Sequence, residues 1–297
     1  MKNIFPGFLS ILTFQFSMAQ TTHFEIQGHR GCRGLLPENT IPAFLKALDL
    51  GVNTLELDVI ITKDKRVLIS HDPFFNPAIS TDPTGKFVLK ESDFNTYQLD
   101  YQEIAKFDVG LRGNPNFPEQ QKTAVSKPLL ADMLKAVEVY RKEKKLPKFS
   151  FNIELKSLVK EYDISQPQVA EFCQLVYDEI MQYVSPKRVV IQSFDFNILS
   201  HWNKQMQSRK FKKMQLSALI EPESENDIQK NLAILGFKPA IWSPYFATLD
   251  DKKVETLHQL GIKVIPWTVN TIDAMKKIKA LGCDGLITDY PDRAKNL

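Results

Sequence analysis

Short apolar segments rich in β-branched and aromatic residues alternate along this 297-residue chain with longer segments whose apolar residues recur at helical spacing. This alternation is typical of parallel strands, because successive parallel strands are usually connected by a helix. Eight such strands with helices between them predict an α/β fold, the (β/α)8 TIM-type barrel. An open doubly wound sheet is the alternative, but no glycine-rich phosphate loop follows the first expected strand.

The expected strands are short and β-rich, and the expected helices are two to four turns long. The strands cover residues 24–28, 54–59, 149–155, 188–192, 215–220, 240–243, 263–267 and 285–288. The helical period is clearest in residues 41–50, 130–144, 169–183 and 272–280.

One long segment, residues 74–127, departs from this alternation. It contains Pro, Gly, Asn, Asp and aromatic residues without a clean period, and it is too long for an ordinary strand-to-helix connection. We therefore expect a small insertion after the second barrel strand, placed over the barrel face where substrates bind. A surface loop without such a role is the alternative, although the aromatic residues favour packed structure. Residues 20–297 are then expected to form one barrel domain.

The first residues of the chain resemble an export signal. Lys2 precedes an apolar run over residues 4–16, and Ser17 and Ala19 are small residues at the positions that a signal peptidase reads. The run is shorter than the ~20 apolar residues of a transmembrane helix, so no stable membrane anchor is expected. We expect residues 1–19 to be a signal peptide and the protein to be exported, with the bacterial periplasm as the preferred compartment.

Charge and cysteine content exclude several classes of protein. The formal net charge of +3 is nearly balanced and does not indicate a nucleic-acid partner or an acidic membrane surface. Three cysteines at distant positions fit neither a disulfide framework nor a zinc site, so buried free thiols are favoured over a single bridge. Neither the net charge nor the cysteine content indicates an oligomeric state. The cysteines are Cys32, Cys173 and Cys283.

Three acidic residues lie on strands expected to be neighbours in the barrel. Glu56 and Asp58 are two residues apart and share one strand face, whereas Leu55 and Leu57 take the other face. Inward carboxylates would repel each other and lose solvation unless a cation joins them. Glu154, on the next barrel strand, can complete such a site for one divalent cation, and Ca²⁺ and Mg²⁺ both suit carboxylate oxygens. A solvated acidic edge strand is the alternative.

Basic and imidazole groups are expected at the same barrel mouth. His29 and Arg30 follow the first strand, and Lys156 follows Glu154 at the end of its strand. The chain after Asp58 is expected to form a β-hairpin that delivers His71 roughly opposite Asp58. A cation with Arg and Lys suits a phosphate ester, and two histidines suit proton transfer near neutral pH. The residues therefore favour phosphodiester cleavage.

A set of short motifs falls mostly at the ends of the expected strands. The motifs are His29-Arg30-Gly31, Leu36-Pro37-Glu38-Asn39-Thr40, Glu56-Leu57-Asp58, His71-Asp72-Pro73, Asn152-Ile153-Glu154-Leu155-Lys156, Gln192-Ser193-Phe194, Trp267-Thr268-Val269-Asn270 and Gly285-Leu286-Ile287-Thr288-Asp289-Tyr290-Pro291. In this order, over nearly the whole chain after residue 19, they resemble the glycerophosphodiester phosphodiesterase family.

The resemblance implies hydrolysis of small-molecule glycerophosphodiesters to sn-glycerol 3-phosphate and an alcohol. It implies one metal ion, an acid/base pair of histidines, and a substrate pocket that includes two phosphate-binding cations. The implied metal ligands are Glu56, Asp58 and Glu154, the acid/base pair is His29 and His71, and the substrate-binding residues are Arg30, Lys156, Gln192 and Trp267.

Several positions and alternatives stay open at this point. Asn39 or Thr40 is expected to cap the following helix, and Asp289 to be a structural loop residue. Glu38 is expected either to orient Arg30 or the metal shell, or only to belong to the loop after the first strand. Either histidine can act as the base, and either water or the neighbouring glycerol hydroxyl can attack phosphorus. A related barrel phospholipase acting on intact lipids and a non-catalytic phosphodiester-binding barrel are the alternative functions.

Overall fold

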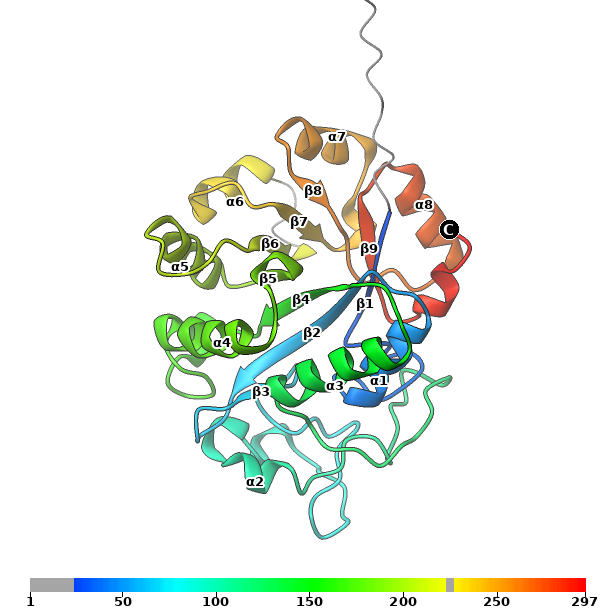
Figure 1. Ribbon diagram of the computed structural model, residues 1–297, viewed down its shortest axis with the longest axis vertical. Helices are drawn as coiled ribbons and strands as arrows, with labels where there is room; N and C mark the ends of the chain where they lie inside the picture. Colours follow the sequence, from blue (N-terminus) through cyan, green and yellow to red (C-terminus); the bar gives the residue numbers. More distant parts are fainter. Residues whose placement is uncertain (1–23, 223–226) are drawn as a thin grey trace, which may run out of the picture.

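A computed structural model describes residues 24–222 and 227–297, so the predicted signal peptide, residues 1–19, lies outside the described residues. In the described part, eight parallel strands form a nearly closed barrel with helices on its outside (Figure 1). The predicted (β/α)8 fold is confirmed. The barrel strands are β1 (Glu25–Gly28), β2 (Thr54–Ile61), β4 (Ser150–Leu155), β5 (Val189–Ser193), β6 (Gln215–Ile220), β7 (Ile241–Pro244), β8 (Lys263–Val264) and β9 (Gly285–Thr288).

The strand order is β8-β7-β6-β5-β4-β2-β1-β9, and backbone hydrogen bonds join its two edges. The amide of Ile287 on β9 donates to Pro266 O, and the amide of Val269 donates to Ile287 O, both at 2.9 Å. Strand β8 is shorter than the predicted strand 263–267, because Pro266 has no amide hydrogen for the ladder. Pairing with β7 resumes at Trp267, whose amide donates to Pro244 O at 2.9 Å.

The helices follow the predicted pattern closely. Helices α4 and α8 have the predicted bounds, and α1 and α3 each end one residue before the predicted end. Each of these helices buries one apolar face against the barrel, as the helical spacing requires. The helices around the barrel are α1 (Ile41–Asp49), α3 (Leu130–Glu143), α4 (Val169–Tyr183), α5 (Phe196–Gln207), α6 (Ile228–Leu235), α7 (Asp251–Gln259) and α8 (Ile272–Ala280).

Apolar side chains fill both the space outside the barrel and one side of its interior. Leu55 and Leu57 of β2 point outward and are fully buried under the helices. The side chains inside the barrel differ in polarity from one strand to another. On the side of β5 to β9, Val190, Ile241 and Ile287 form part of an apolar cluster. The neighbouring interior positions of β2 and β4 carry the carboxylates Glu56, Asp58 and Glu154 and the amide Asn152.

A short strand, β3 (Val67–Ile69), pairs antiparallel with β2 and confirms the predicted hairpin. Its register pairs Val59 with Ile69, so Ser70 lies opposite Asp58, and the Ser70 amide donates to Asp58 O at 3.1 Å. His71 is the next residue after this pair, which agrees with its predicted place roughly opposite Asp58. The pairing centres on Asp64, whereas the predicted turn centre lay half a residue later.

The residues between β3 and α3 have an apolar core of their own, next to the barrel at the end of the molecule that carries α2 (Tyr101–Ile104) (Figure 1). The rings of Phe75 and Phe107 stack with their centroids 3.9 Å apart, and Phe94 packs edge-on against Phe107. Ile60 of the hairpin belongs to the same cluster. The hairpin therefore connects this cluster to the barrel wall.

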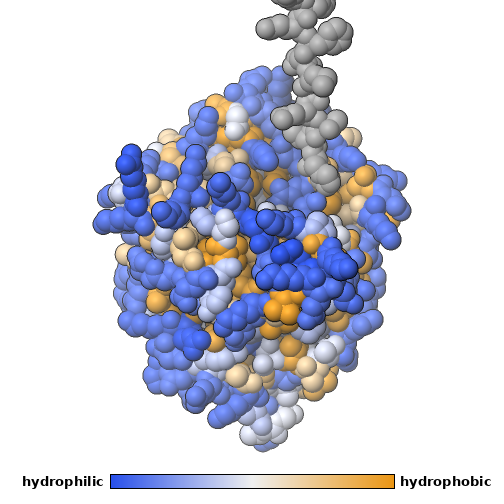
Figure 2. Space-filling model, viewed as in Figure 1, coloured by the Kyte–Doolittle hydropathy of each residue, from blue (hydrophilic) through white to orange (hydrophobic). Residues whose placement is uncertain are grey.

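The surface in Figure 2 is largely hydrophilic, with apolar side chains scattered between charged ones. Within the described residues, no helix combines the length and the apolarity needed to cross a membrane. Cys32, Cys173 and Cys283 are buried free thiols, as predicted.

Candidate active site

Three buried carboxylates meet at the mouth of the barrel. Glu56 and Asp58 lie on β2, Glu154 lies on β4, and the parallel register pairs Asp58 directly with Glu154. One oxygen from each residue lies within 4.8 Å of the others, and the three residues are between 0% and 6% exposed. Asp58 Oδ1 is buried without a hydrogen-bond partner. This donor set fits a divalent cation that prefers oxygen ligands.

Electrostatics at the three carboxylates also favour a cation. Burial, and then repulsion from Asp58 and Glu154, raises the pKa of Glu56 well above its usual value. Burial raises the pKa of Glu154 to about 7, because it outweighs the opposing charge of Lys156. Burial also opposes ionisation of Asp58, but Arg30 outweighs it and holds the pKa of that carboxyl below its usual range. A cation would relieve the repulsion that raises two of these pKa values.

Two neighbouring polar residues orient the acidic cluster. Gln192 donates to Glu56 Oε1 at 2.8 Å, in addition to its predicted place in the pocket wall. Asn39 donates to Asp58 Oδ2 at 2.8 Å, and its side-chain oxygen accepts from the Asp58 amide at 3.3 Å. Thr40 occupies the N-cap of α1, one of the two predicted positions, but its hydroxyl donates to Pro37 O and not to the helix. The positive φ of Asn39, 57°, turns its side chain toward β2.

His29 lies at the end of β1 and is bonded to a residue at the end of β9. Its Nδ1 is 2.6 Å from Asp289 Oδ1, and Asp289 also accepts from Arg33 and Asn270. Burial lowers the pKa of His29 to about 4 although Asp289 opposes this shift, so the ring is neutral near pH 7. Donation from Nδ1 to Asp289 then leaves Nε2 as a proton acceptor.

Asp289 therefore contacts a predicted site residue directly, in addition to its expected structural place in the loop after β9. The adjacency of Gly28 and Thr288 in the β1–β9 register explains the contact, because His29 and Asp289 are the next residues on each strand. The signal available in the sequence was an Asp at the end of the last strand of a closed barrel, where it borders the first strand.

The loop after β1 also depends on a glycine. Gly31 has a φ of +85°, and a Cβ there would lie 2.7 Å from the backbone carbon of Ala43 in α1. Only glycine permits this close approach, which sets the course of the chain directly after Arg30. The Arg30 guanidinium pairs with Glu38 at 2.8 Å and with Asp58 at 3.1 Å. This ion pair is the contact that an orienting role of Glu38 toward Arg30 requires.

His71 approaches the cluster from the hairpin side. Its Nδ1 lies 2.6 Å from Asp72 Oδ1, and Asp72 also accepts from Asn76 at 3.1 Å. Burial and then Arg30 lower the pKa of His71, so it too is neutral near pH 7. Each histidine is thus paired with a carboxylate through Nδ1.

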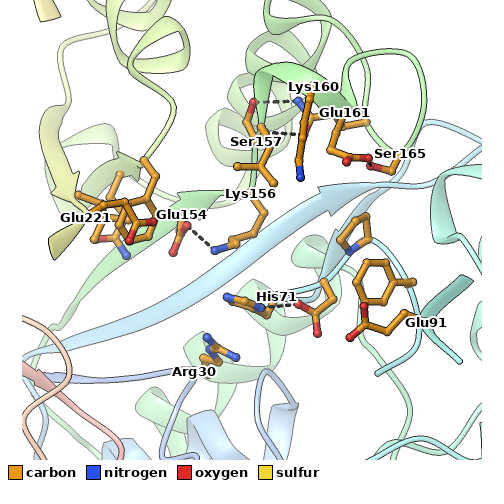
Figure 3. A pocket seen from close by; sticks show the side chains of 18 of the residues that line it. Arg30, His71, Glu91, Glu154, Lys156, Ser157, Lys160, Glu161, Ser165 and Glu221 are labelled. Atoms are coloured by element: carbon orange, nitrogen blue, oxygen red, sulfur yellow. Dashed lines mark hydrogen bonds and ion pairs between the residues drawn. The ribbon is translucent and has the colours of Figure 1, made fainter. Parts of the chain in front are cut away.

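All nine predicted site residues lie at the barrel mouth, and eight of them line one cavity of about 1010 Å³. Asp58 is buried behind this lining. Figure 3 shows Arg30, His71, Glu154 and Lys156 around the cavity. Lys156 Nζ lies 2.7 Å from Glu154 Oε1. Trp267 forms a wall: its ring packs edge-on against Phe194 with centroids 5.4 Å apart. The cavity can hold a substrate larger than the phosphate group itself.

Comparisons with known proteins agree with this geometry. Residues 29–293 match the model of the glycerophosphoryl diester phosphodiesterase family. A glycerophosphodiester phosphodiesterase from Bacillus altitudinis is 30% identical over 270 residues, which cover 91% of this chain and 96% of that protein.

Two solved structures share the fold. A Silicibacter pomeroyi protein named for the same activity has a TM-score of 0.79 and 29% identity, with 92% of each chain covered. An Oleispira antarctica phosphodiesterase in complex with the product sn-glycerol-3-phosphate has a TM-score of 0.69 and 19% identity, with 91% of this chain and 94% of that chain covered.

Proposed function

Since this chain belongs to the glycerophosphoryl diester phosphodiesterase family, we propose that it hydrolyses glycerophosphodiesters to sn-glycerol 3-phosphate and an alcohol. One observation carries the proposal: three buried carboxylates and two histidines with lowered pKa values meet at one cavity. A cluster that only bound a phosphodiester would not need neutral imidazoles held in a defined orientation by carboxylates.

Glu56, Asp58 and Glu154 are the residues that would hold a divalent cation, Ca²⁺ or Mg²⁺. Bound there, such a cation would neutralise charge on the phosphate oxygens. Arg30 and Lys156 lie beside the same carboxylates and supply further positive charge for these oxygens. The cation, Arg30 and Lys156 would together stabilise the negative charge on the phosphoryl group as the ester bond breaks.

The two histidines supply the proton transfers. One neutral imidazole accepts the proton of the attacking hydroxyl at Nε2. The other acts after it has taken up a proton at Nε2 from water, and gives this proton to the leaving alkoxide; loss of the first ring's proton to water then restores both rings. Asp289 holds His29 and Asp72 holds His71 through Nδ1, so the Nε2 atom of each ring is the one available for the reaction. The wall formed by Trp267 limits where the substrate can lie.

The first test is release of sn-glycerol 3-phosphate from glycerophosphocholine by the purified chain, with Ca²⁺, with Mg²⁺ and with EDTA. A Glu56→Gln, Asp58→Asn double variant should reduce release to the EDTA level. The exposed Glu143→Gln change on α3 is the matched control and should leave release unchanged. Release that persists in EDTA would contradict the metal site.

A second arm separates this function from its alternatives. His29→Ala and His71→Ala should each lower kcat by about 10²–10⁴-fold, whereas His201→Ala on α5 should not change it. Phosphatidylcholine vesicles should be poor substrates. Faster turnover of intact bilayer lipid would favour a phospholipase, and binding without product release would favour a non-catalytic barrel.

We also infer export to the periplasm from the apolar run in residues 1–19. Mass spectrometry of the chain recovered from a bacterial periplasm should show cleavage after Ala19. An uncleaved chain confined to the cytoplasm would overturn this inference.

A further inference from the structure

Lys127 is a buried lysine that the proposed chemistry does not use. It directly precedes Pro128, shortly before α3 begins at Leu130, and it is only 7% exposed. Its Nζ donates to Ser70 Oγ at 2.5 Å and to Phe74 O at 3.1 Å, and it lies 4.9 Å from the centre of the Phe75 ring. These contacts are a hydroxyl, a carbonyl and an aromatic ring, all of them uncharged.

An ammonium group with uncharged contacts is costly to bury. Burial lowers the pKa of Lys127 to about 8, although Asp72 and Glu38 act against this shift. A methionine has similar length and would fill the same space without the cost. The donors or the charge of Lys127 therefore have a use that an apolar side chain cannot provide.

The two oxygens that Lys127 contacts lie on either side of His71. Ser70 precedes the His71–Asp72 pair and Phe74 follows it closely, so one ammonium group ties together both ends of this loop. The Ser70 hydroxyl in turn donates to Asp72 O at 2.7 Å, which closes a second bond inside the loop. The amine reaches the loop from a position 57 residues later in the chain.

His71 needs such an anchor because packing alone does not hold it. Its side chain is 32% exposed, whereas that of His29 is 11% exposed. The partner of His29, Asp289, comes from a different strand. The partner of His71, Asp72, belongs to the same loop and cannot by itself fix the loop relative to the barrel.

We propose that Lys127 is a positioning residue that closes the loop of residues 70–74 and thereby holds the His71 imidazole at the catalytic cavity. The effect on catalysis rests on the proposed function. The charge of Lys127 also acts on Asp72: burial opposes ionisation of this carboxyl, but His71 and after it Lys127 bring its pKa to about 2. Asp72 thus stays an acceptor for His71 Nδ1.

The main test compares Lys127→Met with Lys106→Met, an exposed lysine in the same segment, in the full chain acting on glycerophosphocholine. Lys127→Met should lower kcat by about 10- to 100-fold, the usual effect of losing a group that orients a site residue. KM should change less than about twofold, because Lys127 does not line the cavity. A folded Lys127→Met chain with wild-type kcat would overturn the proposal.

Two further measurements separate positioning from folding and from the proposed function. Ser70→Ala removes one contact of Lys127, so it should also lower kcat. The double variant Ser70→Ala, Lys127→Met should have nearly the same kcat as Lys127→Met alone. If Lys127→Met does not fold, an unchanged kcat in Ser70→Ala overturns the proposal. Histidine ¹⁵N NMR should show a shifted His71 ring resonance and an unchanged His29 resonance in Lys127→Met. If the wild-type chain is inactive but the His71 resonance moves, the proposed function fails and the positioning role stands. An unmoved His71 resonance overturns the role.

Discussion

Individual residues at the site owe their properties to burial and to one or two charged contacts. His29 shows this most clearly, since burial lowers its pKa to about 4 while Asp289 favours the charged form. Burial has the larger effect, and Asp289 acts mainly on orientation through Nδ1. The same division of roles applies to His71 and Asp72, although that pair is more exposed.

Replacing Asp289 tests this orienting role at the residue scale. Asp289→Asn should lower kcat by about 10²–10⁴-fold, because an amide can donate to Nδ1 and stabilise the tautomer in which Nε2 carries the proton. Steady-state kinetics with glycerophosphocholine measures the effect. The matched control is Asp284→Asn, which removes the surface pair with His258 and should leave kcat unchanged. Equal effects of the two changes would contradict the orienting role.

At the scale of elements, the hairpin of β2 and β3 connects the site to the segment between β3 and α3. Ile60 and Leu68 of the hairpin pack in one cluster with Phe75 and Phe107, and Lys127 bonds to the loop at the end of β3. His71 is therefore supported by the packing of an element outside the barrel. The carboxylates on β2 and β4 are supported by the barrel itself.

Phe107→Ala tests whether the packing that holds His71 can be weakened without disturbing the carboxylates held by the barrel. Loss of a stacked, buried ring should lower the free energy of unfolding by about 3–5 kcal/mol, measured by urea denaturation. Calcium binding at the carboxylates, measured by calorimetry on the folded variant, should change little while kcat falls. Phe87→Ala is the control, since this side chain is 56% exposed and should cost little stability. A parallel loss of calcium binding in Phe107→Ala would show that the carboxylates also depend on the packing around Phe107, which contradicts the prediction.

At the scale of the whole molecule, Lys127 makes stability depend on pH. Its pKa is about 8 in the folded protein and 10.5 in its unperturbed form. Below pH 8 it is charged in both states, and the cost of burying the charge is fully present. Between pH 8 and 10.5 the folded protein binds fewer protons at this residue than the unfolded chain, so this cost declines as pH rises.

The free energy of unfolding of the wild type should therefore rise relative to Lys127→Met between pH 8 and pH 10.5. The full change corresponds to about 3.5 kcal/mol, from about 1.4 kcal/mol per pKa unit. Urea unfolding of both chains across this pH range measures the difference. As a control, the free energies of unfolding of the wild type and Lys106→Met should differ by the same amount at every pH in this range. If the difference between the wild type and Lys127→Met is also independent of pH, the prediction is wrong.

The sequence by itself predicted the eight barrel strands, four of the helices and the polar residues that meet at the barrel mouth. Strand and helix periodicity are local properties, so the alternation predicts the barrel before any contact is known. The two-residue spacing of Glu56 and Asp58 likewise places them on one face of β2. The parallel neighbour β4 then brings Glu154 beside them, as predicted.

Only the tertiary structure decided which partners orient these groups. His29 and Asp289 meet because the barrel closes and sets β1 beside β9, across a separation of 260 residues. Asn39 turns from the helix start toward Asp58 through a positive φ, and Lys127 reaches the His71 loop because the segment before it packs on the hairpin. Such contacts depend on closure, register and packing between distant segments, which no local period encodes.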